Sequence, residues 1–179
     1  KCEDLPIYHG VKSKKMLQQA GASADGVLLS VGTSANYVSW VKEQIRTGAE
    51  SSGRMLEGFT IAAYLIFSID EDRELARSRV KNRLAYYLGL HGRHDIMRQA
   101  GVPEDLCDLF RDGFLSGSPR SDLITDELID TFTISGEPEE CRKRFQKLLD
   151  AGITQAVVYQ IPEIPMEENM AQVRDYIFT

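Results

Sequence analysis

Four short apolar runs, each followed by a helical pattern, constrain what this chain of 179 residues can fold into. The runs are nearly continuous rather than alternating, as is typical of parallel strands that are covered on both faces. We expect strands at Leu5–Tyr8, Gly26–Val31, Phe59–Ile69 and Ile153–Ile161. Strands that alternate with helices are joined by right-handed crossovers, so the sequence predicts an α/β fold with a parallel sheet.

The segments between the runs have the apolar spacing of amphipathic helices. Helices are expected to begin near Ser13, Ser34, Asp70, Pro138 and Met166. The segment from about 88 to 134 interrupts this rhythm with weaker helical patterns. We interpret it as a helical insertion in one βα unit, so that residues 1–179 form a single domain.

Charge and composition exclude several classes of protein. A formal net charge of -6 argues against a general nucleic-acid binder, which needs a basic face. The longest apolar run is far shorter than the ~20 residues of a membrane span, and the first residues lack the apolar core of a signal peptide. We therefore expect neither nucleic acid nor a membrane as a partner.

The three cysteines, Cys2, Cys107 and Cys141, are widely spaced and form no C-x-x-C pair. An odd number with this spacing favours free thiols in a reducing compartment over a disulfide framework or a zinc site. His91 and His94 stand three apart without a matching carboxylate, which gives no metal-site pattern. The sequence predicts a cytoplasmic protein without a metal.

The stretch 6-PIYHGVKSKKMLQQA-20 places a glycine and three lysines where a strand passes into a helix. Gly10 allows a ligand to approach the backbone, and the helix that starts at Ser13 presents free N–H groups that favour an anion. Lys12 and Lys15 add positive charge. These residues indicate either a phosphate-binding turn or a plain surface turn with solvated lysines.

A second loop of the same kind, 30-SVGTSANY-37, follows the next run. Thr33 or Ser34 can donate to a phosphate, or can simply cap the helix that follows. His9 can face a bound ring or make an ordinary hydrogen bond. Both loops lie at the carboxyl ends of parallel strands, where ligands bind in α/β folds.

The run 6-PIYHGVKSKKMLQQAGASADGVLL-29 resembles the middle of luciferase-like oxidoreductases that depend on flavin or deazaflavin. Two later stretches, 59-FTIAAYLIFSIDEDRELAR-77 and 135-SGEPEECRKRFQKLLDAGI-153, resemble the same family in order and spacing. The branch that reduces methylenetetrahydromethanopterin, a folate-like one-carbon carrier, is the most similar. The pattern departs at Ser13 and Lys14, where the family often has Gly-Pro, and at His9, which replaces an apolar residue.

The resemblance implies a (β/α)₈ barrel of which this chain matches the C-terminal half, strands five to eight, with a helical insert before the last strand. It implies hydride transfer to or from a small organic substrate with deazaflavin coenzyme F420, or alternatively monooxygenation with FMN. A missing N-terminal half, or a second copy of the chain, would complete the barrel. A non-catalytic α/β association module is the other alternative.

The resemblance assigns the coenzyme's phosphate-bearing tail to the turn after the first strand. It places Gly10, Val11, Lys12 and Lys15 there, and names no catalytic residue. The two loops add His9, Ser13 and Thr33 to these four residues. The expected cofactor-binding set is therefore His9, Gly10, Val11, Lys12, Ser13, Lys15 and Thr33.

Overall fold

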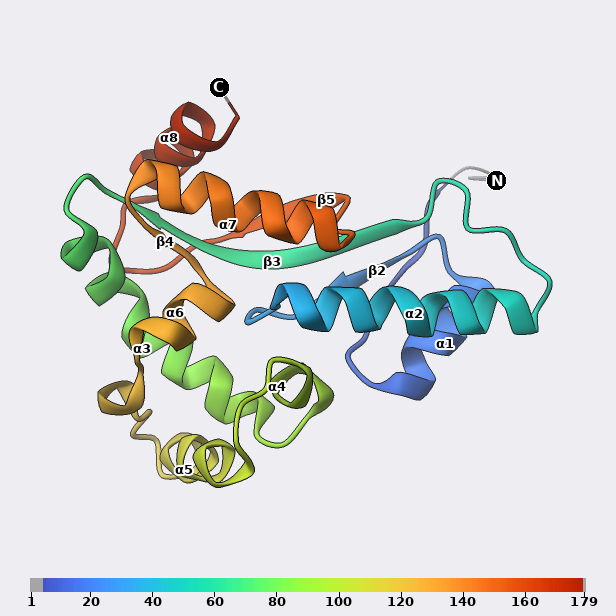
Figure 1. Cartoon of the computed structure of the whole chain (residues 1–179), viewed down its shortest axis with the longest axis horizontal. Coiled ribbons are helices and arrows are strands. Elements are labelled where there is room, and N and C mark those ends of the chain that lie inside the picture. The colour runs from blue at the N-terminus through green and yellow to red at the C-terminus, as the bar shows by residue number, and fades with distance from the viewer. Residues whose placement is uncertain (1–4, 179) are drawn as a thin grey trace.

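The structure is a computed structural model that describes residues 5–178 (Figure 1). Within these residues, one parallel sheet contains the strands β1 (Tyr8–Gly10), β2 (Gly26–Leu29), β3 (Thr60–Ile69), β4 (Ile134–Gly136) and β5 (Gln155–Tyr159). The predicted α/β fold with a parallel sheet is confirmed.

Strand β3 is the centre of the sheet. Ala62 and Ala63 pair with both β2 and β5, so these two strands lie on opposite edges of β3. β1 pairs with β2 on the outside, and β4 pairs with the last three residues of β3. The long strand therefore pairs with residues up to 93 positions away from it in the sequence.

The helices alternate with the strands, as the sequence predicts. They are α1 (Lys14–Ser23), α2 (Ala35–Ser51), α3 (Arg73–His91), α4 (Asp95–Gln99), α5 (Glu104–Leu115), α6 (Asp126–Phe132), α7 (Pro138–Ala151) and α8 (Met166–Ile177), with a 3-10 turn, η1, at Ser121–Leu123. Ser34 caps α2, because its side chain accepts the N–H of Tyr37 at 3.2 Å. Pro138 occupies the first turn of α7, where its missing N–H costs nothing.

One predicted strand was misplaced, and one strand was not predicted. The first strand is Tyr8–Gly10 rather than Leu5–Tyr8, because its partner β2 begins only at Gly26 and the register pairs that residue with Tyr8. The strand β4 was missed altogether. Its three residues are too short to show a pattern, and they are extended because they add to the end of β3.

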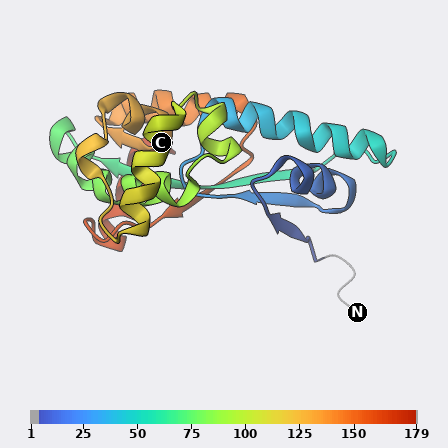
Figure 2. The same cartoon turned by 90° about the horizontal axis from the view of Figure 1, so that it is seen from below.

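The two faces of the sheet differ in cover. Val27, Leu29 and Ala63 point to one face and are completely buried, and α2 and α7 lie along this side of the sheet (Figures 1 and 2). On the other face Tyr8 and Tyr64 remain 39% and 36% exposed. Ala62 and Ile66 on this face are nevertheless buried, so the expected cover on both faces is only partial in the part of the chain that the structure describes.

Helices α1 and α2 pack with unusually close backbones. A Cβ atom on Gly21 would lie 2.0 Å from the carbonyl oxygen of Ile45, and one on Gly48 would lie 1.8 Å from that of Gln18. No side chain fits in either place, so these two glycines set the distance between the helices. The packing fixes the position of the β1–α1 turn relative to α2.

Cys107 and Cys141 are both buried free thiols, and Cys2 lies outside the described residues. Burial raises the pKa of the Cys141 thiol to about 12, so that it stays protonated. None of the helices between residues 5 and 178 combines the length and the apolar character needed to cross a membrane.

Candidate functional site

A cleft of about 600 Å³ opens at the carboxyl ends of β1, β2 and β5. It is lined by Gly10, Val11, Lys12, Met16, Leu28, Leu29, Ser30, Val31, Tyr64, Tyr87 and Tyr159. Its walls are mainly apolar and aromatic, with few polar groups, which is the usual character of a site for a small organic ligand. Ligands of parallel α/β folds bind at this end of the sheet.

Three tyrosines from distant segments form the aromatic side of the cleft. The Tyr87 hydroxyl donates to the Tyr159 hydroxyl at 2.9 Å, and the two rings meet edge to face with centroids 5.4 Å apart. Tyr64 meets Tyr159 in the same way at 6.4 Å. Burial and the neighbouring hydroxyl of Tyr159 raise the pKa of Tyr87, so the phenol is neutral. These rings offer a fixed surface for a planar group.

The opposite side of the cleft is the turn between β1 and α1. Gly10 is the last residue of β1, its φ lies outside the left-handed region, and a Cβ atom added there would have no atom within 4 Å. The turn therefore does not require glycine at this position. What glycine provides instead is open space directly above the strand end.

The backbone of this turn is fixed from α2. Tyr37 is completely buried, and its hydroxyl donates to the carbonyl oxygen of Lys12 at 3.0 Å. Partial burial lowers the pKa of the Lys12 ammonium, and the nearby charge of Arg111 lowers it further. Lys12 is thus a cation in an environment that already disfavours positive charge, and an anion would relieve that cost.

The remaining residues of the predicted set lie around the turn or away from it. His9 is half-buried in β1, opposite Val27. Ser13 precedes α1 in an extended conformation, and its hydroxyl makes no capping hydrogen bond. Lys15 is exposed on the first turn of α1. None of these three side chains lines the cleft.

The hydroxyl groups of the second loop serve the fold itself. Thr33 is 1% exposed and donates to the carbonyl oxygen of Ser30 at 2.8 Å, while Ser34 caps α2. Both residues line a different cavity, of about 400 Å³, between α2, α6 and α7. The structure does not bring Thr33 to the cleft that contains Gly10 and Lys12.

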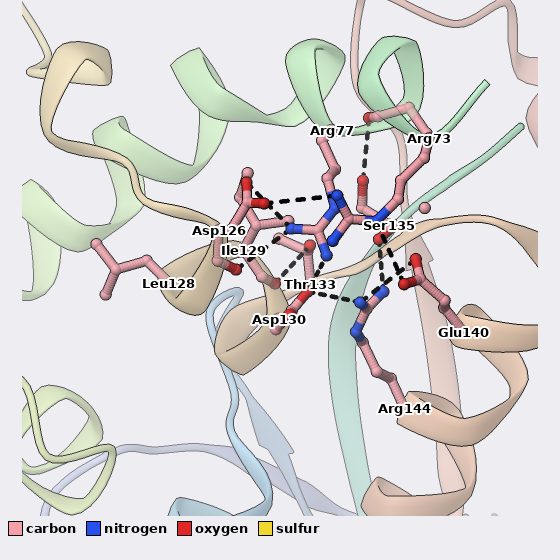
Figure 3. Close-up of polar contacts among 12 residues, drawn as sticks. Arg73, Arg77, Asp126, Leu128, Ile129, Asp130, Thr133, Ser135, Glu140 and Arg144 are labelled. Carbon is pink, nitrogen blue, oxygen red and sulfur yellow. Dashed lines mark hydrogen bonds and ion pairs between the residues drawn. The ribbon is translucent and has the colours of Figure 1, made fainter.

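An ion-pair network, which we call the arginine network, lies beside this second cavity (Figure 3). It consists of Arg73, Arg77, Asp126, Asp130, Glu140 and Arg144. Arg77 is 1% exposed and contacts Asp126 at 3.3 Å and Asp130 more closely still. Figure 3 shows the three guanidinium groups directed at carboxylates from α6 and α7, so the network ties these helices to α3.

The histidines do not form a metal centre. His91 is 2% exposed, and its Nε2 lies 2.7 Å from the carbonyl oxygen of Val31, to which it must donate. Burial lowers its pKa to about 4. Among residues 5–178, no group of three or more His, Cys, Asp and Glu side chains is placed to hold a metal ion.

Sequence reasoning missed most of the cleft. Tyr64 and Tyr159 belong to strands, and their apolar neighbours gave no sign that they face a ligand site. Tyr87 and Met16 lie on helices, and neither was in the predicted cofactor-binding set. Met16 is 53% exposed and lines the cleft.

Comparisons with known proteins identify relatives of this chain. The chain is 35% identical over 163 residues to 5,10-methylenetetrahydromethanopterin reductase of Methanolobus tindarius, covering 88% of this chain and 48% of that protein. It is 31% identical over 168 residues to a putative coenzyme F420-dependent oxidoreductase of Mycobacterium tuberculosis, covering 87% and 47%. The chain therefore spans about half the length of these curated relatives.

A solved structure and a family match complete the comparison. The coenzyme F420-dependent tetrahydromethanopterin reductase from Methanopyrus kandleri superposes with a TM-score of 0.77 at 28% identity, over 98% of this chain and 50% of that one. Residues 2–155 match the family described as luciferase-like monooxygenase. This chain belongs to the luciferase-like monooxygenase family.

Proposed function

We propose that this chain forms one wall of the active site of an oxidoreductase that transfers a hydride between coenzyme F420 and a small organic substrate. Methylenetetrahydromethanopterin reductases are the relatives that suggest this reaction. The observation that carries the proposal is the cleft itself, in which Gly10, Val11 and Lys12 face an aromatic wall at the carboxyl end of the sheet. The deazaflavin ring would supply the redox chemistry.

The residues of the cleft would bind and orient the coenzyme. Tyr64, Tyr159 and Leu28 offer an apolar surface for a planar ring, and the open space above Gly10 lets a bulky group reach the backbone. Lys12, held through its carbonyl oxygen by Tyr37, would attract a negatively charged tail. We assign no proton transfer to any of these side chains.

We further propose that residues 1–179 are one half-barrel domain, the C-terminal half of a (β/α)₈ barrel, with the helical insertion at about 88–134. β1, β2, β3 and β5 would be strands five to eight, and β4 an addition at the end of β3. The partly exposed face with Tyr8 and Tyr64 supports this view, because the interior of a complete barrel is filled with side chains.

A half-barrel leaves β1 and β5 as outer strands whose edges can pair with another chain. We propose that an N-terminal half, or a second copy of this chain, covers them. Light scattering coupled to size-exclusion chromatography should give at least a dimer for the isolated chain. A compact, well-behaved monomer of 20.1 kDa with little exposed apolar surface would contradict this part of the proposal.

The buried free thiols Cys107 and Cys141 suit a reducing compartment, and we propose a cytoplasmic location on that basis.

Coenzyme choice is tested by fluorescence titration of the chain, assembled with an N-terminal half from a relative where needed, with F420 and with FMN. We expect F420 to bind more tightly, by tenfold or more. A preference for FMN would instead favour a monooxygenase, and no binding of either would favour a non-catalytic module.

The variant Gly10→Ala tests where the coenzyme lies. Because a Cβ atom at this position meets no atom within 4 Å, folding stability should be unchanged or slightly higher, while coenzyme affinity should fall. Glu57→Ala, an exposed change in the loop before β3, is the matched control and should leave affinity unchanged. Equal affinity for F420 in Gly10→Ala and the native chain would remove Gly10 from the site.

A further inference from the structure

Arg111 differs from the other arginines between α3 and α6. Arg93 pairs with Glu104 at 2.6 Å and more closely with Asp108, Arg98 pairs with Asp95 at 2.7 Å, and Arg120 pairs with Asp122 at 2.7 Å. Within residues 5–178, Arg111 has no carboxylate at ion-pair distance. Its guanidinium makes two long contacts of 3.5 Å, to the carbonyl oxygens of Gly89 and Leu90.

Arg111 lines a hollow of about 470 Å³ between the end of α3, α4 and α5. The other lining residues are Leu90, His91, Gly92, Arg93, His94 and Asp108. This hollow adjoins the cleft, because His91 lines the hollow and donates to the carbonyl oxygen of Val31, which lines the cleft. The two spaces thus share a wall.

Three basic groups line the two adjoining spaces, Lys12 the cleft and His94 and Arg111 the hollow, and we call them the open cation group. Arg111 is close enough to Lys12 to lower the pKa of its ammonium, although burial has the larger effect. Burial, followed by the charge of Lys12, likewise lowers the pKa of His94. The three groups therefore interact unfavourably with each other in the absence of an anion.

The acids nearest to the open cation group are already engaged. Asp95 lies beside His94 in the chain but pairs with Arg98, and Asp108 in the hollow accepts two hydrogen bonds from Arg93. The chain as a whole carries six more negative than positive charges. Basic groups left without an acid in such a chain suggest that the missing negative charge comes from a ligand.

An independent observation comes from the ring of His91. Its Nε2 donates to Val31, so in the neutral ring Nδ1 can only accept a hydrogen bond. Nδ1 is buried and has no partner in the described structure, although the residue is only 2% exposed. Buried acceptors are rarely left unused, so a donor from outside the chain is expected here.

We infer that the hollow between α3, α4 and α5 is a subsite for a phosphate or carboxylate group that carries a neighbouring hydroxyl. Arg111, His94 and Lys12 bind the oxyanion, and His91 Nδ1 accepts a hydrogen bond from the hydroxyl. This inference rests on the proposed function insofar as the ligand is the tail of the molecule in the cleft. A free phosphate ester offers the same chemistry.

The test is an NMR titration of the folded full chain with three probes: glycerol 3-phosphate, inorganic phosphate and glycerol. We follow the ring signals of His91 and His94. Glycerol 3-phosphate should bind most tightly and shift both rings, phosphate should shift mainly His94, and glycerol should shift neither. Identical shifts with all three probes, or none with any, would overturn the inference.

The variant Arg111→Gln should weaken glycerol 3-phosphate binding about tenfold, as expected for the loss of a hydrogen bond to a charged group. Arg120→Gln is the matched control, because it removes the same charge from the same segment at an arginine that is already paired. His94→Gln provides a second variant in case Arg111→Gln folds poorly. An equal loss in Arg120→Gln, or no loss in Arg111→Gln and His94→Gln, would contradict the subsite.

A binding experiment with the coenzyme distinguishes failure of this inference from failure of the proposed function. F420 and the same deazaflavin without its phosphate-bearing tail are compared on the native chain and on Arg111→Gln. A tenfold loss for F420 alone supports the subsite as the place of the tail. Equal affinities of F420 for both proteins would refute that placement while leaving F420 as the coenzyme, whereas failure of both compounds to bind would count against the proposed function only.

Discussion

The arginine network and the open cation group contain similar side chains in opposite surroundings. In the network, Arg77 is almost completely buried and is matched by Asp126 and Asp130 from another helix. In the open cation group, Arg111 and Lys12 have no acid at ion-pair distance in the described chain. A buried charge must be paired in the fold itself, whereas cations at the edge of a cleft can remain unpaired until a ligand arrives.

The largest expected effect comes from breaking the network. Asp130→Asn removes a carboxylate that serves both Arg77 and Arg144, and leaves the buried Arg77 with only the longer contact to Asp126. The free energy of unfolding should fall by about 3 kcal/mol, the lower end for an uncompensated buried charge, since Asp126 remains. Urea unfolding measures this change.

Asp126→Asn is the matched control for that prediction. Its contacts with Arg73 and Arg77 are longer, 3.5 and 3.3 Å, and its side chain is 58% exposed. Asp126→Asn should therefore lower the free energy of unfolding clearly less than Asp130→Asn does. Equal losses in the two variants would mean that the network is held by its geometry as a whole rather than by the Asp130 contacts.

A second prediction concerns the histidine that separates the cleft from the hollow. The pKa of His91 is lowered by burial from 6.5 to about 4. As the pH falls, the unfolded chain takes up this proton first, so stability is lost between pH 6.5 and about 4 and the loss then levels off. The total loss in the free energy of unfolding is roughly 3 kcal/mol, since each pKa unit corresponds to about 1.4 kcal/mol.

His91→Gln isolates this contribution, because glutamine keeps an N–H that can donate to Val31 but does not titrate. The difference in unfolding free energy between native and variant should shrink by that amount on going from pH 7 to pH 4. His94→Gln is the control, since His94 is exposed and should change the pH profile far less. A pH-independent difference for His91→Gln would show that burial does not lower the pKa of His91 in the folded protein.

The smallest expected effect on stability comes from a substitution in the open cation group. Arg111→Gln removes the repulsion with Lys12 but also a cation–π contact of 5.4 Å with Phe114. These effects oppose each other, so stability should change by no more than about 0.5 kcal/mol. Thermal unfolding with and without glycerol 3-phosphate measures it, and a large loss without ligand would make Arg111 a structural residue.

Local patterns predicted the parts of this structure that depend on local interactions. The helix that starts after Ser34 and the one that starts at Pro138 were expected from their caps and apolar spacing, and both are present. The turn at Gly10 was expected at a strand end because an apolar run stops there. β4 was not, since three residues carry no period and become a strand only when β3 is beside them.

Within the candidate site, too, local sequence indicated some residues and not others. Gly10, Val11 and Lys12 are consecutive, so a single stretch of sequence indicated them, and all three line the cleft. Thr33 looked equivalent, but its hydroxyl donates within its own loop. Arg111 was not predicted at all, because its importance depends on the absence of an acid nearby, which no spacing reveals.

The sequence by itself determined the alternation of strands and helices, the parallel sheet and the turn after β1, because apolar periodicity and helix caps act over a few residues. Only the tertiary structure decided which face of the sheet stays open, which tyrosines meet across the cleft, and which cations lack an acid. Those properties depend on the packing of segments far apart in the chain, such as Tyr87 against Tyr159 and Lys12 near Arg111. The same residue types thus became a structural ion pair in one place and a candidate binding site in another.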